Sequence, residues 1–66
     1  MVILINGAAR ELPAGCSAAQ LLEQLGLTGK RLALEVNMEI LPRSLFATYL
    51  LNEGDRVEVV HAIGGG

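Results

Sequence analysis

Only one segment of this 66-residue sequence has the periodicity of an amphipathic helix, and strand-like segments lie on both sides of it. Within residues 17–25 the apolar side chains that recur at helical spacing are Ala18, Leu21, Leu22 and Leu25. Ser17 is a good N-cap and Gln20 completes a capping box, while Gly26 is typical of the position after a helix. Because one helix can cover only one face of one sheet, the sequence predicts an α+β layer arrangement.

Short apolar or alternating runs that end at turn residues predict four or five strands. Residues 1–5 lead into Asn6-Gly7, a dipeptide that favours a two-residue hairpin turn, and residues 8–12 return. After the helix, the predicted strands are residues 32–36, 40–41 and 56–63, with turns at residues 37–39 and 52–55. Residues 44–51 fit either a short helical turn or an irregular crossover. We expect a mixed sheet with one main helix packed on one face, and with the first and last strands adjacent at the centre.

The composition predicts one domain with an aliphatic core. A chain of this size buries only about 60% of its unfolded surface, and Cys16 alone cannot form an intramolecular disulfide. Hydrophobic residues make up 52% of the sequence, but Phe and Tyr occur once each and Trp is absent, so aliphatic side chains must supply the stability. We expect a domain at residues 1–63 and a flexible tail at residues 64–66. The predicted core joins Leu21, Leu22 and Leu25 to Ile3, Ile5, Leu34, Val57 and Val59.

Charge and hydropathy argue against several classes of protein. The net charge of -2 and the scarcity of aromatic residues disfavour a nucleic-acid-binding protein. The longest apolar runs are far shorter than a membrane span, and the N-terminus lacks the pattern of a signal peptide. A free cysteine fits a reducing compartment. We therefore expect a cytoplasmic protein that contacts neither nucleic acid nor membrane.

Three consecutive glycines, Gly64, Gly65 and Gly66, follow the last predicted strand. One interpretation is a frayed end, since glycine is common in disordered termini. The other is functional, because a strip without side chains can enter a narrow active site that a larger residue would block. A terminal carboxylate presented in this way can attack the α-phosphate of ATP and form an acyl-adenylate. That intermediate is open to attack by a nucleophile.

The sequence resembles the ThiS family of ubiquitin-like β-grasp sulfur carriers, which serve thiamine biosynthesis, over nearly its whole length. The stretches that carry the resemblance are VILING at residues 2–7, AG at 14–15, LLEQL at 21–25, LEVN at 34–37, ILPR at 40–43, EGD at 53–55 and HAIGGG at 61–66. Each stretch is short, but their order and spacing together are specific. The resemblance implies a β-grasp fold with a mixed sheet of four or five strands.

The resemblance also implies the chemistry of the tail and the partners that perform it. Gly66 would be adenylated by a ThiF-like adenylyltransferase related to ubiquitin-activating enzymes, which uses ATP and magnesium. Sulfur from a cysteine desulfurase or another donor would then give a thiocarboxylate, which delivers sulfur to a ThiG-like thiazole synthase. Gly65 would be the essential neighbour of the reacting group, and Gly64 would extend its reach. The carrier itself would be no enzyme and would hold no catalytic residue, cofactor or metal.

Four other residues or pairs have structural interpretations that we favour over functional ones. Cys16 has no histidine or second cysteine near it in sequence, so we interpret it as a small, partly buried apolar residue. His61 lies at strand spacing without a cluster of ligands, which indicates a surface or interface residue rather than a metal site. Glu53 and Asp55 flank Gly54 in a turn, where Asp commonly bonds to the backbone. Arg43 is expected to be a solvated charge.

Alternation in the first and last strands predicts a docking surface. Met1, Ile3 and Ile5 would face the helix, so Val2 and Leu4 would face away from it, on the side of Val60. Apolar residues gathered on an open sheet face suggest a partner surface. Alternatively, Val2, Leu4 and Val60 are ordinary scattered surface aliphatics.

Two other functions fit parts of the same pattern. A small subunit of molybdopterin synthase is a β-grasp carrier with the same tail chemistry, but it is usually longer. A β-grasp binding or regulatory module without tail chemistry is the alternative from a different class. Such a module would tolerate truncation of its tail, whereas a carrier would not.

Overall fold

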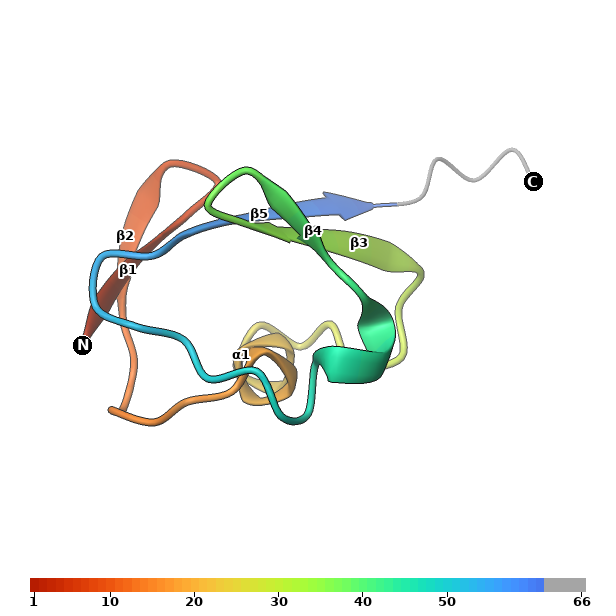
Figure 1. The fold of residues 1–66 in the computed structure, drawn as a ribbon, viewed down its shortest axis with the longest axis horizontal. Helices are drawn as coiled ribbons and strands as arrows, with labels where there is room; N and C mark the ends of the chain where they lie inside the picture. The colour runs from red at the N-terminus through yellow and green to blue at the C-terminus, as the bar shows by residue number, and fades with distance from the viewer. Residues whose placement is uncertain (62–66) are drawn as a thin grey trace.

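The computed structural model describes residues 1–61, and within that range five strands form one sheet on which a single α-helix packs (Figure 1). The elements are β1 (Val2–Ile5), β2 (Ala8–Glu11), α1 (Ala18–Gln24), β3 (Leu32–Val36), β4 (Glu39–Leu41), the 3-10 helix η1 (Arg43–Leu45) and β5 (Arg56–His61). The predicted α+β class and the single covering helix are confirmed.

The strand order in the sheet is β2-β1-β5-β3-β4. β1 runs parallel to β5, and the other neighbours are antiparallel. The last strand is therefore central, with the first strand on one side and β3 on the other, as the sequence predicts. Figure 1 shows α1 and η1 on the same side of this sheet.

Two hairpin turns use residues with positive φ angles. Asn6 and Gly7 have φ values of 49° and 86°, which is the left-handed pair that a two-residue hairpin of this type requires. Asn37 and Met38 form the corresponding turn between β3 and β4, with φ values of 52° and 71°. The second turn is one residue shorter than predicted, because Glu39 already pairs with Val36.

The helix begins and ends where the sequence predicts. The Ser17 hydroxyl accepts a hydrogen bond from the Gln20 backbone N–H at 3.1 Å, and Gln20 Oε1 accepts one from the Ser17 N–H at 2.9 Å. This reciprocal capping box satisfies two N–H groups that the first turn of a helix leaves free. Gly26, with φ at 72°, follows the C-cap residue Leu25.

The segment for which the sequence left two alternatives contains both. η1 is a short helical turn, and an irregular stretch follows it up to an isolated bridge between Leu50 and Ser17. This crossover is held by the start of α1: the Ala18 N–H donates to the Tyr49 carbonyl at 2.9 Å, and the Ala19 N–H to the Phe46 carbonyl at 2.8 Å. These bonds satisfy further N–H groups of the first helical turn.

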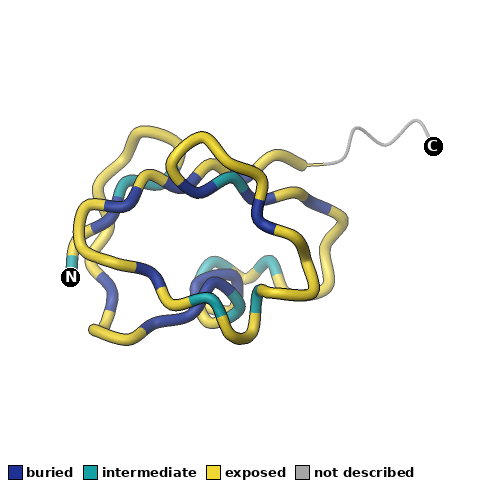
Figure 2. The backbone as a smooth tube through the Cα atoms, viewed as in Figure 1, coloured by how far each residue is buried: buried dark blue, intermediate teal, exposed yellow. Residues whose placement is uncertain are grey.

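The core lies between the sheet and α1, and Figure 2 shows the buried positions along both. Its largest fully buried side chains are Ile3, Leu12, Leu21, Leu34 and Val57. Leu22 is also buried, at 6% exposed, as predicted. The prediction was wrong for Leu25 and Ile5, which are only half-buried. Leu25 caps the end of the helix and Ile5 ends β1, so both lie at the rim of the two-layer core.

Candidate functional site

The strand that leads to the three glycines is hydrogen-bonded on both sides. On the β1 side, the Leu4 N–H donates to the Asp55 carbonyl and the Asn6 N–H to the Val57 carbonyl, both at 2.9 Å. The Asn6 side chain then extends this ladder past the turn, because its Oδ1 accepts from the Val59 N–H at 2.9 Å. β3 pairs with β5 over the full length from Val57 to His61. The end of β5 is therefore held by β3 up to His61 and, on the opposite side, by Asn6 up to Val59.

A second side-chain network fixes the start of β5. The buried Asp55 carboxylate accepts from the Asn37 amide at 3.0 Å and from the Asn52 backbone N–H at 2.8 Å. Asn37 Oδ1 in turn accepts from the Arg56 N–H at 3.0 Å. Sequence reasoning assigned Asp55 to a turn, which is confirmed, but it missed this bond to the β3–β4 turn. An Asn at a positive-φ turn position indicates the turn only, and nothing local identifies its distant partner.

Val2, Leu4 and Val60 lie on the face of the sheet opposite α1. Val2 is 42% exposed and Val60 49%, whereas Leu4 is half-buried. In the parallel register Leu4 is the neighbour of Arg56, so Val60 lies four residues, or about 13 Å, farther along β5. The structure therefore places the three residues on one face without bringing Val60 next to the other two.

Cys16 is buried in the core, at 4% exposed, so its structural interpretation is confirmed. Burial raises the pKa of its thiol, and the negative charge of Glu23 adds to this effect. The Sγ atom lies 3.5 Å from the Ser17 carbonyl oxygen and donates a weak hydrogen bond to it. A buried thiol that holds its proton more tightly than usual is a poor nucleophile.

The remaining candidates lie on the surface or in turns. His61 is exposed at the end of β5, as predicted. Glu53 accepts a hydrogen bond from the Val2 N–H at 2.9 Å and so supports the turn. Arg43 is exposed, but it is not simply a solvated charge, since its Nη2 lies 3.4 Å from the Leu32 carbonyl oxygen and donates to it. Gly64, Gly65 and Gly66, and the predicted last two residues of the final strand, lie outside the described residues.

Residues 1–61 contain neither a cluster of metal ligands nor a membrane-spanning helix. Within that range, no three His, Cys, Asp or Glu side chains gather in a way that would hold a metal ion. No helix in the same range is long and apolar enough to cross a bilayer.

The element order, with a parallel pairing of the first and last strands beneath one helix, defines a protein of the ubiquitin-like β-grasp class. The model of the ThiS family matches residues 3–66, which is nearly the entire sequence and includes all three terminal glycines. The chain belongs to the ThiS family, the sulfur carriers of thiamine biosynthesis. The predicted family is confirmed.

Similarities to individual proteins support the family assignment. The chain is 36% identical to the sulfur carrier protein ThiS of Escherichia coli, and the match covers 100% of both chains. It is 41% identical over 66 residues to a thiazole synthase of Paramagnetospirillum magneticum, although it spans only 20% of that protein's length. Among solved structures, ThiS of Geobacter metallireducens has a TM-score of 0.86 at 28% identity, with complete coverage of both chains.

Proposed function

We propose that this chain carries sulfur on the C-terminal carboxylate of Gly66 and delivers it for the formation of the thiazole ring of thiamine. The observation that carries the proposal is the alignment of the glycine tail with the family. The family match runs to Gly66, and the match to the Escherichia coli sulfur carrier covers both chains completely. The chain contributes an end group and a surface, and the partners contribute the catalysis.

The proposed chemistry converts the C-terminal carboxyl group in three steps. A carboxylate oxygen of Gly66 attacks the α-phosphate of ATP, a bond to phosphorus forms, and pyrophosphate leaves. A sulfur nucleophile from the donor then attacks the carbonyl carbon of the adenylate, and AMP leaves. When the donor is a persulfide the product is an acyl disulfide; a thiol then attacks its donor-side sulfur, the S–S bond breaks, a disulfide forms on the donor side, and the thiocarboxylate is left on Gly66. ATP and magnesium are used by the activating partner in this scheme, not held by the carrier.

The fold supports this role through the position of β5. Because β5 is paired with β3 up to His61, and held on the β1 side up to Val59, the tail begins at a fixed point, five residues before its end. Fixing one end of a short reactive segment raises its effective concentration in a partner's active site. Gly64 and Gly65 then supply a narrow strip that a partner can enclose closely.

Three partners are proposed. An adenylyltransferase related to ubiquitin-activating enzymes would activate Gly66, and a cysteine desulfurase or other donor would supply the sulfur. A thiazole synthase would receive it. The last of these is supported by the thiazole synthase relatives from two organisms, each of which contains a stretch similar to all 66 residues of this chain.

We also propose that the open sheet face contacts the adenylyltransferase. Val2 and Leu4 are adjacent on β1, and Leu4 borders a shallow depression of about 430 Å³ with Arg56 and Glu58. Exposed aliphatic residues beside charged ones are typical of a partner surface with an apolar centre and a polar rim. Val60 would contact a separate part of the partner, since it lies farther along β5, toward the tail.

Two tail variants test the proposed function. Deletion of Gly66 shortens the reach by up to about 3.6 Å, and addition of one alanine after Gly66 displaces the carboxylate and adds a Cβ. We expect both variants to melt like the parent and neither to be adenylated by ATP and the activating enzyme. The parent should gain the mass difference between sulfur and oxygen when a donor is added. Arg10→Gln, on the edge strand β2, is the matched control and should be loaded normally.

Loading of the alanine-extended variant as efficiently as the parent would contradict the proposal. The glycines would then be better explained as the frayed end of a binding module. Copurification with a molybdopterin synthase large subunit, rather than with a thiazole synthase, would instead indicate the related carrier.

A further inference from the structure

The two hairpin turns beside β5 hold that strand in the same way. Asn6 and Asn37 are each the first central residue of a two-residue turn, with φ values of 49° and 52°. Asn6 Oδ1 accepts a hydrogen bond from the Val59 backbone N–H at 2.9 Å. Asn37 Oδ1 accepts one from the Arg56 backbone N–H at 3.0 Å. The two asparagines therefore hold β5 at different points, Asn37 at its first residue and Asn6 in its second half.

Asn6 replaces a backbone acceptor at the end of the β1 ladder. The backbone of β1 is bonded to β5 as far as Val57, whose carbonyl accepts from the Asn6 N–H at 2.9 Å. If the parallel ladder continued, the Val59 N–H would donate to a backbone carbonyl of the neighbouring strand. The chain turns away at Asn6 instead, and the side-chain oxygen takes the place of that carbonyl. Among residues 1–61, no hydrogen bond on this side lies farther along β5.

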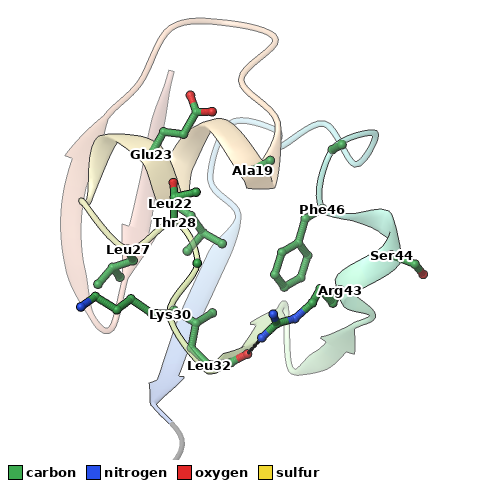
Figure 3. Close-up of a pocket in the computed structure, with 12 residues that line it drawn as sticks. Ala19, Leu22, Glu23, Leu27, Thr28, Lys30, Leu32, Arg43, Ser44 and Phe46 are labelled. Atoms are coloured by element: carbon green, nitrogen blue, oxygen red, sulfur yellow. Dashed lines mark hydrogen bonds between the residues drawn. The ribbon is translucent and has the colours of Figure 1, made fainter.

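On the β3 side of the same end, backbone pairing continues to His61, whose partner is Leu32, the first residue of β3. Leu32 is in turn tied to the η1 region. A pocket of about 300 Å³ opens beside Phe46, and on its wall the Arg43 guanidinium donates to the Leu32 carbonyl at 3.4 Å (Figure 3). The end of β5 is thus held on one side by a strand, and on the other by a single amide side chain.

We propose that Asn6 is a positioning residue for the loading of this carrier. Its bond to Val59 keeps the end of β5 in the sheet on the β1 side, and so fixes the point at which residues 62–66 begin. The inference rests on the proposed function, in which Gly66 is the group that is adenylated. A reacting group tethered at a fixed point reaches the productive geometry more often than one tethered at a loose point. Asn6 therefore acts on the rate through Val59 and touches no reacting atom.

Three variants separate this role from a general effect on stability. Asn6→Gly removes the side-chain acceptor, while glycine retains the left-handed turn conformation. Asn37→Gly is the matched control, because it makes the same exchange at the corresponding position of the other turn. It removes the bond to Asp55 as well as the one to Arg56, so it should destabilise the domain at least as much. Asn6→Asp keeps an oxygen acceptor on a residue type that tolerates this backbone conformation.

The kinetics of adenylation give the first readout, with the activating enzyme, ATP and increasing concentrations of carrier, at a temperature where every variant is folded. We expect Asn6→Gly to lower kcat by at least about tenfold, with KM within about twofold of the parent value. Asn37→Gly and Asn6→Asp should keep kcat within about twofold of the parent. A merely structural role of Asn6 would lower Tm and leave kcat of the folded protein unchanged.

Amide hydrogen exchange of the full-length chain gives a second readout that needs no enzyme. In Asn6→Gly the Val59 amide should exchange at least about tenfold faster than in the parent, measured relative to the amides of β3. In Asn37→Gly the Val59 amide should keep its relative rate, and the Arg56 amide should exchange faster. An unchanged relative rate for Val59 in Asn6→Gly would show that Asn6 does not hold the end of β5, and would overturn the proposal.

The kinetic outcomes are equally distinct. Equal kcat values for Asn6→Gly and the parent would overturn the positioning role and leave the carrier function standing. A raised KM with unchanged kcat would also overturn it, because Asn6 would then be a direct contact of the enzyme. So would an equal loss of kcat in Asn6→Gly and Asn37→Gly, which would follow from lost stability. If the proposed function itself were wrong, the parent would not be adenylated, and the positioning role would fall with it even though Val59 exchange responded to Asn6→Gly.

Discussion

The side-chain amide of Asn37 donates to the buried carboxylate of Asp55 at 3.0 Å, although the two residues are 18 positions apart. This bond joins the turn between β3 and β4 to the residue that precedes β5. The Asn37 backbone N–H also donates to the Arg56 carbonyl at 2.7 Å. Together these contacts hold the start of β5, the strand that leads to the glycine tail.

Removal of the Asp55 carboxylate should therefore destabilise the whole domain. Asp55→Ala leaves the Asn52 N–H and the Asn37 amide without their acceptor, and we expect a loss of about 2–3 kcal/mol in the free energy of unfolding. Urea denaturation provides the measurement. Glu53→Ala is the matched control, because that exposed carboxylate serves only the Val2 N–H, and it should cost about 0.5 kcal/mol. Equal losses in the two variants would argue against the network.

Leu22 tests the core between the helix and the sheet. Because it is 6% exposed, Leu22→Ala should leave a cavity and lower the free energy of unfolding by about 2–5 kcal/mol. Ile40→Ala, at a position that is 72% exposed, should change it by less than about 0.5 kcal/mol. Thermal or urea unfolding of the two variants, measured side by side, tests this difference in stability. A Leu22→Ala protein as stable as the parent would contradict the assignment of Leu22 to the core.

The thiol of Cys16 should be protected from alkylation in the native state. Burial raises its pKa, so the folded chain holds the proton more tightly than the unfolded chain does. That difference stabilises the fold below the ordinary pKa of cysteine and is lost as the pH rises through the higher, folded-state value. We expect native labelling by a thiol reagent to be much slower than labelling in denaturant at the same mildly alkaline pH. In Cys16→Ala the thiol-linked part of the alkaline loss of stability should disappear.

Equal rates of labelling in native and denaturing conditions would show that the thiol is accessible. In that case Cys16 would need a role other than packing. The measurement is independent of any partner protein.

The open sheet face should respond to an introduced charge. Leu4→Glu should weaken binding to the adenylyltransferase by at least about tenfold, or 1.4 kcal/mol, because the carboxylate would lose its water against an apolar surface. Leu45→Glu, at an exposed residue on the helix side, is the control for added charge. Calorimetry on folded variants provides the measurement. Unchanged affinity would refute the interface, and unfolding of Leu4→Glu would instead assign Leu4 to the core.

The elements that could be predicted from the sequence are those set by neighbouring residues. The Asn6-Gly7 turn and the Ser17–Gln20 capping box each depend on contacts within a few positions, so their residue types identify them. The alternation of apolar and polar residues in β5 is also a local pattern, and it correctly predicted that Val57 and Val59 lie in the core. Local patterns of this kind were sufficient for the order of the elements and hence for the fold class.

Features that depend on distant pairings could not be predicted. Leu12 and Leu51 are buried although neither belongs to a strand or helix, because the chain folds them under the sheet by contacts far away in sequence. The Leu51 N–H, for example, donates to the Cys16 carbonyl at 2.9 Å. The pocket beside Phe46 likewise arises from three separate segments, and no periodicity in any one of them indicates it.

The central place of β5 has a mechanical consequence. A partner that pulls on the tail applies its force along the axis of a strand whose hydrogen bonds to β1 and β3 lie across that axis. Such a force loads the hydrogen bonds of both ladders at the same time. A force on an edge strand, directed away from the sheet, would instead break the hydrogen bonds of that strand one after another. Tension along the last strand is therefore expected to load both ladders at once rather than one hydrogen bond at a time.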